Sequence, residues 1–267
     1  MALITLTTDF GTTDPYVGIM KGVIAARAPG VPVIDVTHGI PAQDVLAGAL
    51  VLRHAIPYFP RGAIHVAVVD PGVGTSRRAL CVVTETAVLV GPDNGLLSLA
   101  AFEAQRIVAL ADERFFLTPR SATFHGRDVF APVAAALATG TEPAALGPAV
   151  SDMERVSLPS AVPGAAGISG QVIYVDRFGN LTTNISDAAL AAFSRPDLSI
   201  SIAGAHLRGI AASYGAVPRG QPVAVVNSWG LLEIAVRDGS ASALLGAGVG
   251  HTVTVEVPER TAVRRSR

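Results

Sequence analysis

The sequence predicts an α/β N-terminal domain with a central, mostly parallel sheet, followed by a smaller C-terminal β-barrel domain. The chain has 267 residues, half of them apolar, which is enough for a large core and for two domains. Strand-length apolar runs alternate with helix-spaced segments as far as about residue 150. After Gly170 only short strand-like runs separated by turns follow. We therefore expect one domain over residues 1–160 and a second over residues 170–260.

The elements of the N-terminal half follow from the spacing of its apolar residues. Asp14 and Pro15 suggest the N-cap and the first residue of the first helix. The turn at 91–95 is expected to open a short helix at Leu96. The expected strands are 3–8, 31–36 and 63–69 with a hairpin of 79–84 and 87–90, and the expected helices are 16–26, 44–58 and 129–138.

The C-terminal half is predicted to consist mostly of strands. Residues 143–170 are rich in Pro, Gly, Ser and Ala, as expected of a linker. Residues 241–250 are expected to form a loop or a short helix. Five short strand-like runs are expected, at 171–175, 198–202, 223–227, 231–236 and 252–257.

Composition argues against several classes of protein. Charged residues make up 15% of the chain and the net charge is −1, so we expect no basic face for nucleic acid. The sequence shows no apolar run of about 18 residues and no signal-peptide pattern at Met1, so we expect no membrane segment and a cytoplasmic location. The single cysteine, Cys81, excludes an internal disulfide, and its apolar neighbours indicate a buried structural thiol.

The strongest candidate site begins at Asp70, where the apolar run at 63–69 stops. Pro71 begins a turn, Gly74 allows backbone to approach a ligand, and Arg77 follows. A carboxylate at the end of a buried strand is where open α/β sheets bind ligands. The alternative is a tight turn in which Asp70 caps its own loop. Further polar clusters on predicted loops favour a ligand site, and they lie at 9–14, 93–94, 123–128, 176–180 and 227–229.

Other catalytic arrangements have less support. A divalent-metal hydrolase could use Asp9, His38, Asp70 and His125, but no two of these have the HxH or HxxxH spacing that fixes a metal on one element. The G-x-S-x-G elbow of Ser-His-Asp hydrolases is absent, as are the GxGxxG and P-loop signatures of nucleotide binding. We interpret His54 and His206 as surface or core residues, and His65, which lies inside a predicted strand, as a core residue.

Seven longer motifs run nearly from end to end of the chain. They are TTDFGTTDPYVGIMKG at 7–22, VIDVTH at 33–38, IHVAVVDPGVGTSRRA at 64–79, GPDNGLL at 91–97, TFHGRDVFAP at 123–132, YVDRFGNLTTNI at 174–185 and VNSWGLLEIA at 226–235. Together they resemble one family, the S-adenosylmethionine hydroxide adenosyltransferases, which are relatives of the fluorinases and chlorinases. Several long motifs in a fixed order are far more specific than one short pattern.

The resemblance implies a fold, an assembly and a reaction. Family members combine an α/β N-terminal domain with a C-terminal β-barrel. They form trimers whose active sites lie between the N-terminal domain of one subunit and the C-terminal domain of the next. The implied reaction is S-adenosylmethionine plus water giving adenosine and L-methionine. S-adenosylmethionine is then the substrate, and no separate cofactor or metal is implied.

The resemblance also implies roles for individual residues. Asp70, Arg77 and His125 would form the catalytic set of the hydrolases, and Asp9 would hold the ribose 2′- and 3′-hydroxyls. The other implied substrate-binding residues are Thr123 and Phe124 in the TFHGRD motif, Phe178, Asn180 and Tyr214 for adenine, and Asp176, Ser228 and Trp229 toward methionine.

Three positions distinguish this chain from the halogenases. Those enzymes have a tyrosine in place of Asp70, a ribose-packing tryptophan in place of Gln43 and an arginine in place of Trp229. Asp70 therefore favours water as the nucleophile. The alternatives are a 5′-halogenase and a sensor that binds S-adenosylmethionine without converting it, although a sensor has no need of a water-activating group.

Overall fold

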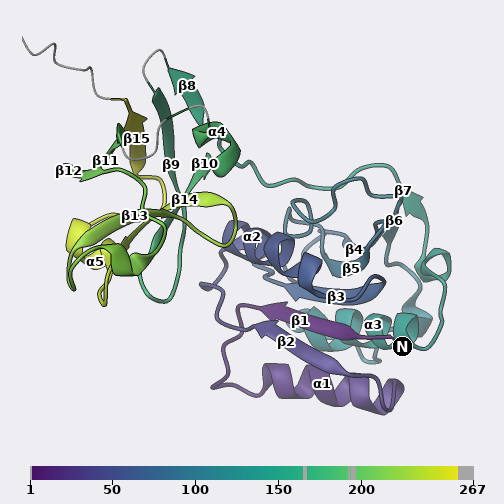
Figure 1. The fold of residues 1–267 in the computed structure, drawn as a ribbon. Coiled ribbons are helices and arrows are strands. Elements are labelled where there is room, and N and C mark those ends of the chain that lie inside the picture. Colours follow the sequence, from purple (N-terminus) through teal and green to yellow (C-terminus); the bar gives the residue numbers. More distant parts are fainter. Residues whose placement is uncertain (1, 165–166, 192, 194–196, 258–267) are drawn as a thin grey trace, which may run out of the picture. The chain divides into compact units, whose positions relative to one another are not determined.

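Contacts along the chain separate two units, Met1–Ser157 and Leu158–Arg267, in the computed structural model (Figure 1). The structure describes residues 2–164, 167–191, 193 and 197–257. The expected end of the second domain at residue 260 lies outside the described residues.

The first unit is built on one seven-stranded sheet. Its strands are β1 (Ile4–Thr8), β2 (Val33–Thr37), β3 (Ala63–Val68), β4 (Ala79–Val83), β5 (Ala87–Pro92), β6 (Arg106–Ala109) and β7 (Ala149–Val150), in the order β2-β1-β3-β5-β4-β6-β7. The β2-β1-β3-β5 half is parallel, whereas β4, β6 and β7 make antiparallel pairs. The sheet is therefore mixed, and the prediction of a mostly parallel sheet holds for one half only. The tight turn between β4 and β5 forces that pair to be antiparallel.

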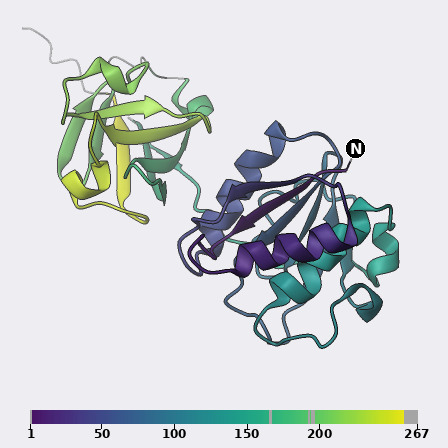
Figure 2. The same ribbon diagram turned by 90° about the horizontal axis from the view of Figure 1, so that it is seen from below.

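Helices cover both faces of this sheet. Figure 2 shows α1 (Tyr16–Arg27) and α3 (Ala131–Ala138) together on one face, with α2 (Val45–Ala55) on the other. Leu6 of β1, Met20 and Ile24 of α1, and Val133 of α3 belong to one buried core. Because strand side chains alternate between faces, the odd residues of β1 point toward the α2 side.

Three expectations about where helices start were wrong. The first helix begins at Tyr16, as the range 16–26 predicted, but its cap residue is Pro15, without a side-chain cap, and not Asp14. Asp44 lies outside α2 and caps it by accepting from the Ala47 N–H at 2.9 Å. No helix forms at Leu96: the side chain of Asn94 accepts from the Leu96 N–H, but the chain continues in turns.

The second unit is a curved, nearly barrel-shaped antiparallel sheet. Its strands are β8 (Val162–Gly164), β9 (Gly167–Val175), β10 (Leu181–Ser186), β11 (Ser199–Ile202), β12 (Ala205–Arg208), β13 (Pro222–Val226), β14 (Leu231–Val236) and β15 (Thr252–Glu256). The order is β12-β11-β15-β9-β10-β14-β13, with β8 paired to β9. The short helices α4 (Asp187–Leu190) and α5 (Ala241–Leu245) lie between strands. All five expected strands are present, but β8, β10 and β12 were not predicted from the sequence.

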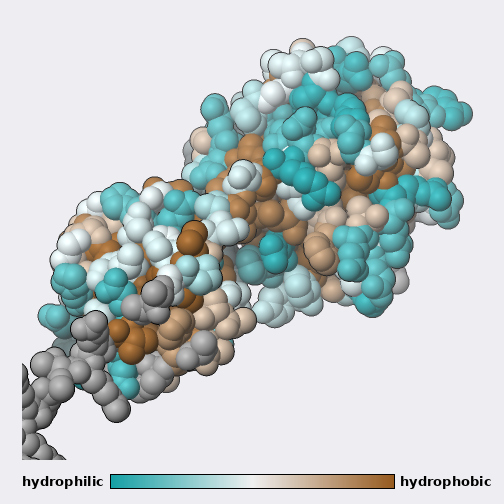
Figure 3. Space-filling model, turned by 90° about the horizontal axis from the view of Figure 1, so that it is seen from above, coloured by the Kyte–Doolittle hydropathy of each residue, from teal (hydrophilic) through white to brown (hydrophobic). Residues whose placement is uncertain are grey.

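The segment expected as a linker, 143–170, is partly structured. It contains a 3₁₀ turn at Pro143–Leu146, β7, β8 and the start of β9, and its longest described stretch without helix or strand is 151–161. Cys81 is fully buried, as predicted, and burial raises the pKa of its thiol to about 12. The face seen in Figure 3 carries hydrophobic patches among hydrophilic residues on each unit. Among the described residues, no helix combines the length and apolar character needed to cross a bilayer.

Candidate active site

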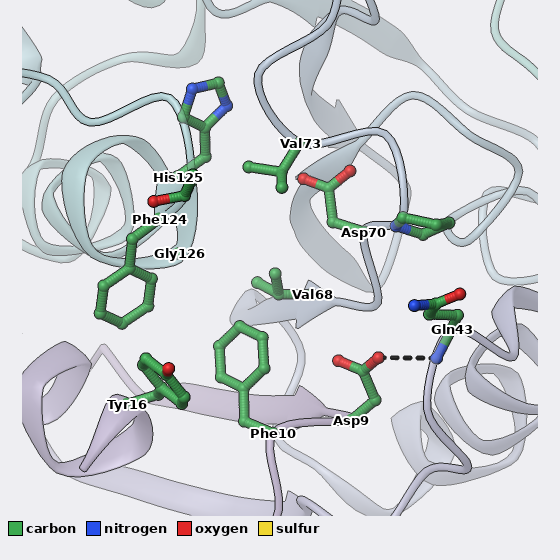
Figure 4. A pocket seen from close by; sticks show the side chains of 12 residues that line it. Asp9, Phe10, Tyr16, Gln43, Val68, Asp70, Val73, Phe124, His125 and Gly126 are labelled. Carbon is green, nitrogen blue, oxygen red and sulfur yellow. Dashed lines mark hydrogen bonds between the residues drawn. The ribbon is translucent and has the colours of Figure 1, made fainter. Parts of the chain in front are cut away.

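Two parallel strands bring two predicted carboxylates to the same edge of the first sheet. β1 and β3 pair in register, with Thr8 opposite Val68, so Asp9 and Asp70 both follow the carboxyl ends of neighbouring strands. A cavity of about 400 Å³ opens at this edge (Figure 4). Its lining residues are Asp9, Phe10, Tyr16, Gln43, Val68, Asp70, Pro71, Val73, Thr123, Phe124, His125 and Gly126.

The carboxylate of Asp70 is held by the guanidinium of Arg77. Nε of Arg77 donates to Oδ1 at 2.9 Å, and Nη2 donates to Oδ2. The pair is bidentate and nearly buried, with 5% of the Asp70 side chain exposed. Asp70 is therefore not a turn residue that caps its own loop, which was the alternative interpretation.

His125 completes a chain of three polar groups. Nη2 of Arg77 also lies 2.8 Å from Nδ1 of His125, and the guanidinium carbon lies 5.5 Å from the centre of the Phe130 ring. His125 stands at the start of a π-helical turn, Gly126–Phe130, which leads into α3. The structure thus brings together the three residues predicted to be catalytic.

The contact with Arg77 determines which nitrogen of His125 carries the proton. A guanidinium can only donate, so Nδ1 of His125 must accept, and the proton of the neutral ring is on Nε2. Burial and the positive charge of Arg77 lower the pKa of His125 below 6.5, and nearby Asp70 opposes this only in part. We conclude that His125 is a neutral hydrogen-bond donor at neutral pH.

Asp9 is anchored by backbone on the other side of the cavity. Its Oδ2 accepts from the N–H of Gln43 at 2.9 Å, the bond drawn in Figure 4. Gln43 adopts φ of +66°, a left-handed conformation that costs a non-glycine residue energy. This bond occupies one oxygen of Asp9 and leaves the other available to a ligand.

Three aromatic rings form one wall of the cavity. Phe10, Tyr16 and Phe124 pack in pairs with ring centres 5.2 to 6.0 Å apart (Figure 4). Phe124 was expected from the TFHGRD motif, as was Thr123, which also lines the cavity. Phe10 and Tyr16 were missed, although both lie within the first long motif, beside Asp9 and at the start of α1.

The loop that carries Asp70 and the segment that carries His125 touch at Gly74. Gly74 has φ of +78°, and a Cβ placed on it would collide with the carbonyl oxygen of Ala122. Glycine is therefore required twice, for its conformation and for this close approach. The contact fixes how far His125 lies from the Asp70 loop.

The predicted adenine residues gather in the second unit. A cavity of about 520 Å³ is lined by Asp176, Phe178, Asn180 and Tyr214, together with residues 237–239, which the sequence did not indicate. The Phe178 ring is 75% exposed. The Tyr214 hydroxyl donates to Glu233 at 2.8 Å, and burial together with Glu233 raises the pKa of Tyr214 to about 12, so this hydroxyl keeps its proton.

Only one of the three residues expected near methionine lies in this cavity. Asp176 lies in the same cavity as Phe178, and its carboxylate accepts from the N–H of Phe178, the N–H of Asn180 and Nδ2 of Asn180, each at 2.9 Å. Ser228 and Trp229 do not line this cavity. Their turn is held by Asn227, whose Oδ1 accepts from the Trp229 N–H at 2.9 Å.

Of the four residues considered for a metal hydrolase, three line one cavity and the fourth, His38, does not. Nδ1 of His38 lies 2.8 Å from Oγ1 of Thr8, its ring is buried, and it does not line the cavity that Asp9, Asp70 and His125 share. Within the described part of the chain, no group of three or more His, Cys, Asp or Glu residues is arranged to hold a metal ion. His65, expected in the core, is 1% exposed.

The fold and the site define a class: an α/β unit with a carboxylate–guanidinium–imidazole set at its sheet edge, followed by an all-β unit with an aromatic-lined cavity. Family models agree with both halves. Residues 4–147 match the SAM hydroxide adenosyltransferase N-terminal domain, and residues 170–254 match the C-terminal domain. The chain belongs to the SAM hydroxide adenosyltransferase family.

Individual relatives give the same result. The (R)-S-adenosyl-L-methionine hydrolase of Thermus thermophilus is 43% identical over 92% of this chain and 96% of its own length. The (R)-S-adenosyl-L-methionine hydrolase of Salinispora arenicola is 43% identical over 94% of this chain and 97% of its own length. A fluorinase from Actinoplanes is more distant, at 28% identity over 95% of this chain and 97% of its own length. A crystal structure of an uncharacterized conserved protein from Thermotoga maritima superposes with a TM-score of 0.89, at 34% identity over 95% of this chain and 99% of that one.

Proposed function

We propose that this protein hydrolyses S-adenosyl-L-methionine to adenosine and L-methionine by attack of water on the ribose C5′. The observation that carries the proposal is the hydrogen-bonded chain Asp70–Arg77–His125, whose first and last members line the cavity at the sheet edge. Two (R)-S-adenosyl-L-methionine hydrolases that are 43% identical over most of the chain support the same reaction.

The chemistry requires activation of the nucleophile more than of the leaving group. The sulfonium leaves as a neutral thioether, so the electron pair of the breaking C5′–S bond ends on sulfur. Water is hardly ionised at neutral pH, so the site must orient one water molecule and accept its proton as the new O–C5′ bond forms.

The protonation state of the site assigns these two tasks. His125 already carries its ring proton on Nε2 and offers Nδ1 to Arg77, so it donates to the water or to a neighbouring oxygen and does not take a proton. Asp70 is the acceptor, since each carboxylate oxygen retains a second lone pair after bonding to Arg77. Proton acceptance and positioning each contribute roughly 10²–10⁴-fold in general acid–base catalysis.

Arg77 organises the other two groups without touching the water. Its bidentate bond fixes the direction of the Asp70 carboxylate. Its positive charge disfavours protonation of His125. One guanidinium therefore orients the base and keeps the donor neutral.

The substrate is assigned to the two cavities by the chemistry of their walls. The free oxygen of Asp9 suits the ribose hydroxyls, Thr123 and Phe124 line the same cavity and are assigned to substrate binding, and Phe178, Asn180 and Tyr214 suit adenine. Asp176, Ser228 and Trp229 are assigned to the methionine end. We propose a homotrimer in which the first unit of one subunit and the second unit of the next share each substrate molecule.

The product of a reaction in labelled water tests the proposal. We expect S-adenosyl-L-methionine incubated in ¹⁸O-water to give adenosine with the label on the 5′-oxygen, measured by chromatography and mass spectrometry. We expect no 5′-chloro- or 5′-fluoro-adenosine in excess halide, because an ionised Asp70 near the nucleophile site repels an anion. Halogenated nucleoside as the main product, unlabelled adenosine, or bound but unchanged substrate would each contradict the proposal.

A further inference from the structure

The turn that carries Asp9 is held mainly by a buried histidine outside the cavity. The turn follows the end of β1, and the N–H of Phe10 donates to Oγ1 of Thr8 at 3.2 Å. The N–H of Gly11 donates to the carbonyl oxygen of His38 at 2.8 Å, and Nδ1 of His38 lies 2.8 Å from Oγ1 of Thr8. His38 therefore meets this turn through both its side chain and its backbone.

The far side of the His38 ring faces a charged pair. Nε2 lies 3.0 Å from Oδ1 of Asp35, an electrostatic contact without the alignment of a hydrogen bond, and Nζ of Lys21 lies 2.6 Å from Oδ2 of Asp35. Burial alone would raise the pKa of Asp35, but Lys21 and His38 lower it. The ionised carboxylate favours the His38 proton on Nε2.

This placement of the proton determines the direction of the hydrogen bonds that link His38, Thr8 and Phe10. With the proton on Nε2, Nδ1 of His38 accepts from the Thr8 hydroxyl. The lone pairs of Thr8 Oγ1 are then available to the N–H of Phe10, so the Thr8 hydroxyl and the Phe10 N–H each meet an acceptor.

Asp35, His38 and Thr8 resemble a nucleophile triad in geometry, but burial excludes that role. Thr8 is 0% exposed and His38 is 6% exposed, and neither lines the cavity. The arrangement acts instead on Asp9, which follows Thr8 directly. The Gln43 N–H holds the Asp9 carboxylate from one side, and the Thr8–His38 bond holds its backbone from the other.

We propose that His38, acting through Thr8, is a positioning residue that fixes the Asp9 carboxylate for recognition of a ribose with free 2′- and 3′-hydroxyls. The inference rests on the proposed function, in which Asp9 binds the ribose. It adds that selectivity for the ribose diol depends on two buried residues that do not touch the substrate.

The chain offers a matched control on the same strand. Oγ1 of Thr5 lies 2.8 Å from Nδ1 of His65, so β1 carries a second buried Thr–His bond, remote from Asp9. Thr5 is 0% exposed, like Thr8. Thr8→Val and Thr5→Val each remove one hydroxyl from such a bond with little change of shape, and Thr8→Ser retains the hydroxyl.

The readout is the ratio of the affinities for adenosine and 2′,3′-dideoxyadenosine, measured by titration calorimetry on the full chain. We expect the wild type and Thr5→Val to prefer adenosine, Thr8→Val to lose about fivefold to tenfold of that ratio, and Thr8→Ser to restore it. If Thr8→Val does not fold, His38→Leu takes its place with the same expectation.

Each outcome decides one question. A wild type without preference for adenosine overturns the role of Asp9 in the proposed function. A wild type with the preference and a Thr8→Val variant that keeps it overturns the role of His38. An equal loss in Thr5→Val also overturns it, because the effect would then be a general one on the sheet.

Discussion

At the scale of single residues, the site depends on one guanidinium that serves two partners. The planar fork of Arg77 reaches both oxygens of Asp70 and still presents Nη2 to His125. A lysine ammonium in the same place could not make a bidentate bond and contact an imidazole in a fixed plane. Arg77 therefore determines both the position of the base, Asp70, and the tautomer of the donor, His125.

The first prediction at this scale concerns Asp70. Asp70→Asn keeps the shape but removes the proton acceptor, so we expect the kcat for S-adenosyl-L-methionine hydrolysis to fall by about 10²–10⁴-fold. We expect the Kd for adenosine, measured by calorimetry, to stay within about tenfold of the wild type, because binding does not need the base.

Asp93→Asn is the matched control. Asp93 is also buried and accepts from an arginine, with Nε of Arg78 at 2.7 Å, but it lies outside the cavity. We expect it to lower stability while leaving kcat near that of the wild type. Unchanged turnover in Asp70→Asn would remove Asp70 from the catalytic set.

The second prediction concerns the acid side of the pH profile. The pKa of His125 lies below 6.5, so the neutral donor form is present at pH 7 and is lost only as the pH falls below that value. Protonation would place a second positive charge against Arg77 and break the contact at Nδ1. We expect kcat/KM to fall on this limb with a midpoint below pH 6.5. The residual activity of His125→Gln should lack that limb, and a wild-type midpoint above pH 6.5 would contradict the assignment.

At the scale of elements, the site is assembled by the parallel half of the sheet and by one close loop contact. The Asp9 turn and the Asp70 loop follow neighbouring parallel strands, whereas His125 directly precedes the π-helical turn that leads into α3. Gly74 is where the Asp70 loop meets that segment. This contact links the base to the donor.

Substitution of Gly74 tests that link. We expect Gly74→Ala to lower the free energy of unfolding by about 1–2 kcal/mol from the left-handed backbone alone. The collision with Ala122 adds to this and should lower kcat by displacing His125. Denaturant titration and steady-state kinetics measure the two effects.

Gly30→Ala separates conformation from collision. Gly30 has φ of +80°, close to that of Gly74, but a Cβ there would meet nothing within 4 Å. It should cost stability without loss of kcat. Equal kinetics in the two variants would show that the Gly74 contact does not position His125.

Particular elements show how far sequence reasoning reached. The strands ending at Thr8 and Val68 were predictable because they are apolar runs that stop at a turn, and Asp9 and Asp70 follow from where those runs stop. β10 was missed because its sequence, LTTNIS, is mostly polar, although Thr182 and Thr183 are buried and their hydroxyls bond to Glu233 and to the carbonyl of Leu232. The Asp70–Arg77 pair was implied by the family resemblance, but the proton position on His125 depends on a distance that no sequence pattern contains.

At the scale of the whole molecule, the chain carries two cavities of complementary chemistry. The first unit has the polar groups that the reaction needs, and the second has the aromatic residues that suit a base. Neither set alone matches a whole nucleoside sulfonium. Under the proposed trimer, each substrate molecule is held by two neighbouring subunits. The fraction of intact sites in trimers mixed from two variants can therefore be predicted.

Mixing two inactive variants tests the shared site. Asp70→Asn inactivates the first unit, and Asn180→Ala weakens the adenine cavity of the second. In trimers reassembled from equal amounts of both, a shared site is intact when an Asn180→Ala subunit supplies the first unit and an Asp70→Asn subunit supplies the second. Random assembly makes about a quarter of the sites intact, so we expect about a quarter of wild-type activity. If each site were made within one chain, every site would carry one defective half and no activity would return.

A second mixture provides a comparison that does not depend on how much activity the subunits regain after reassembly. Wild type mixed with an equal amount of the double variant, Asp70→Asn with Asn180→Ala, leaves about a quarter of shared sites intact but about half of the sites made within one chain. Subunit exchange is followed by native mass spectrometry, and wild type taken through the same dissociation and reassembly sets the reference. Equal recovery of activity in the two mixtures supports the shared site. Only a site formed by two neighbouring subunits has the same intact fraction, about a quarter, in both mixtures. Recovery of half in the second mixture and none in the first would place each complete site within a single chain.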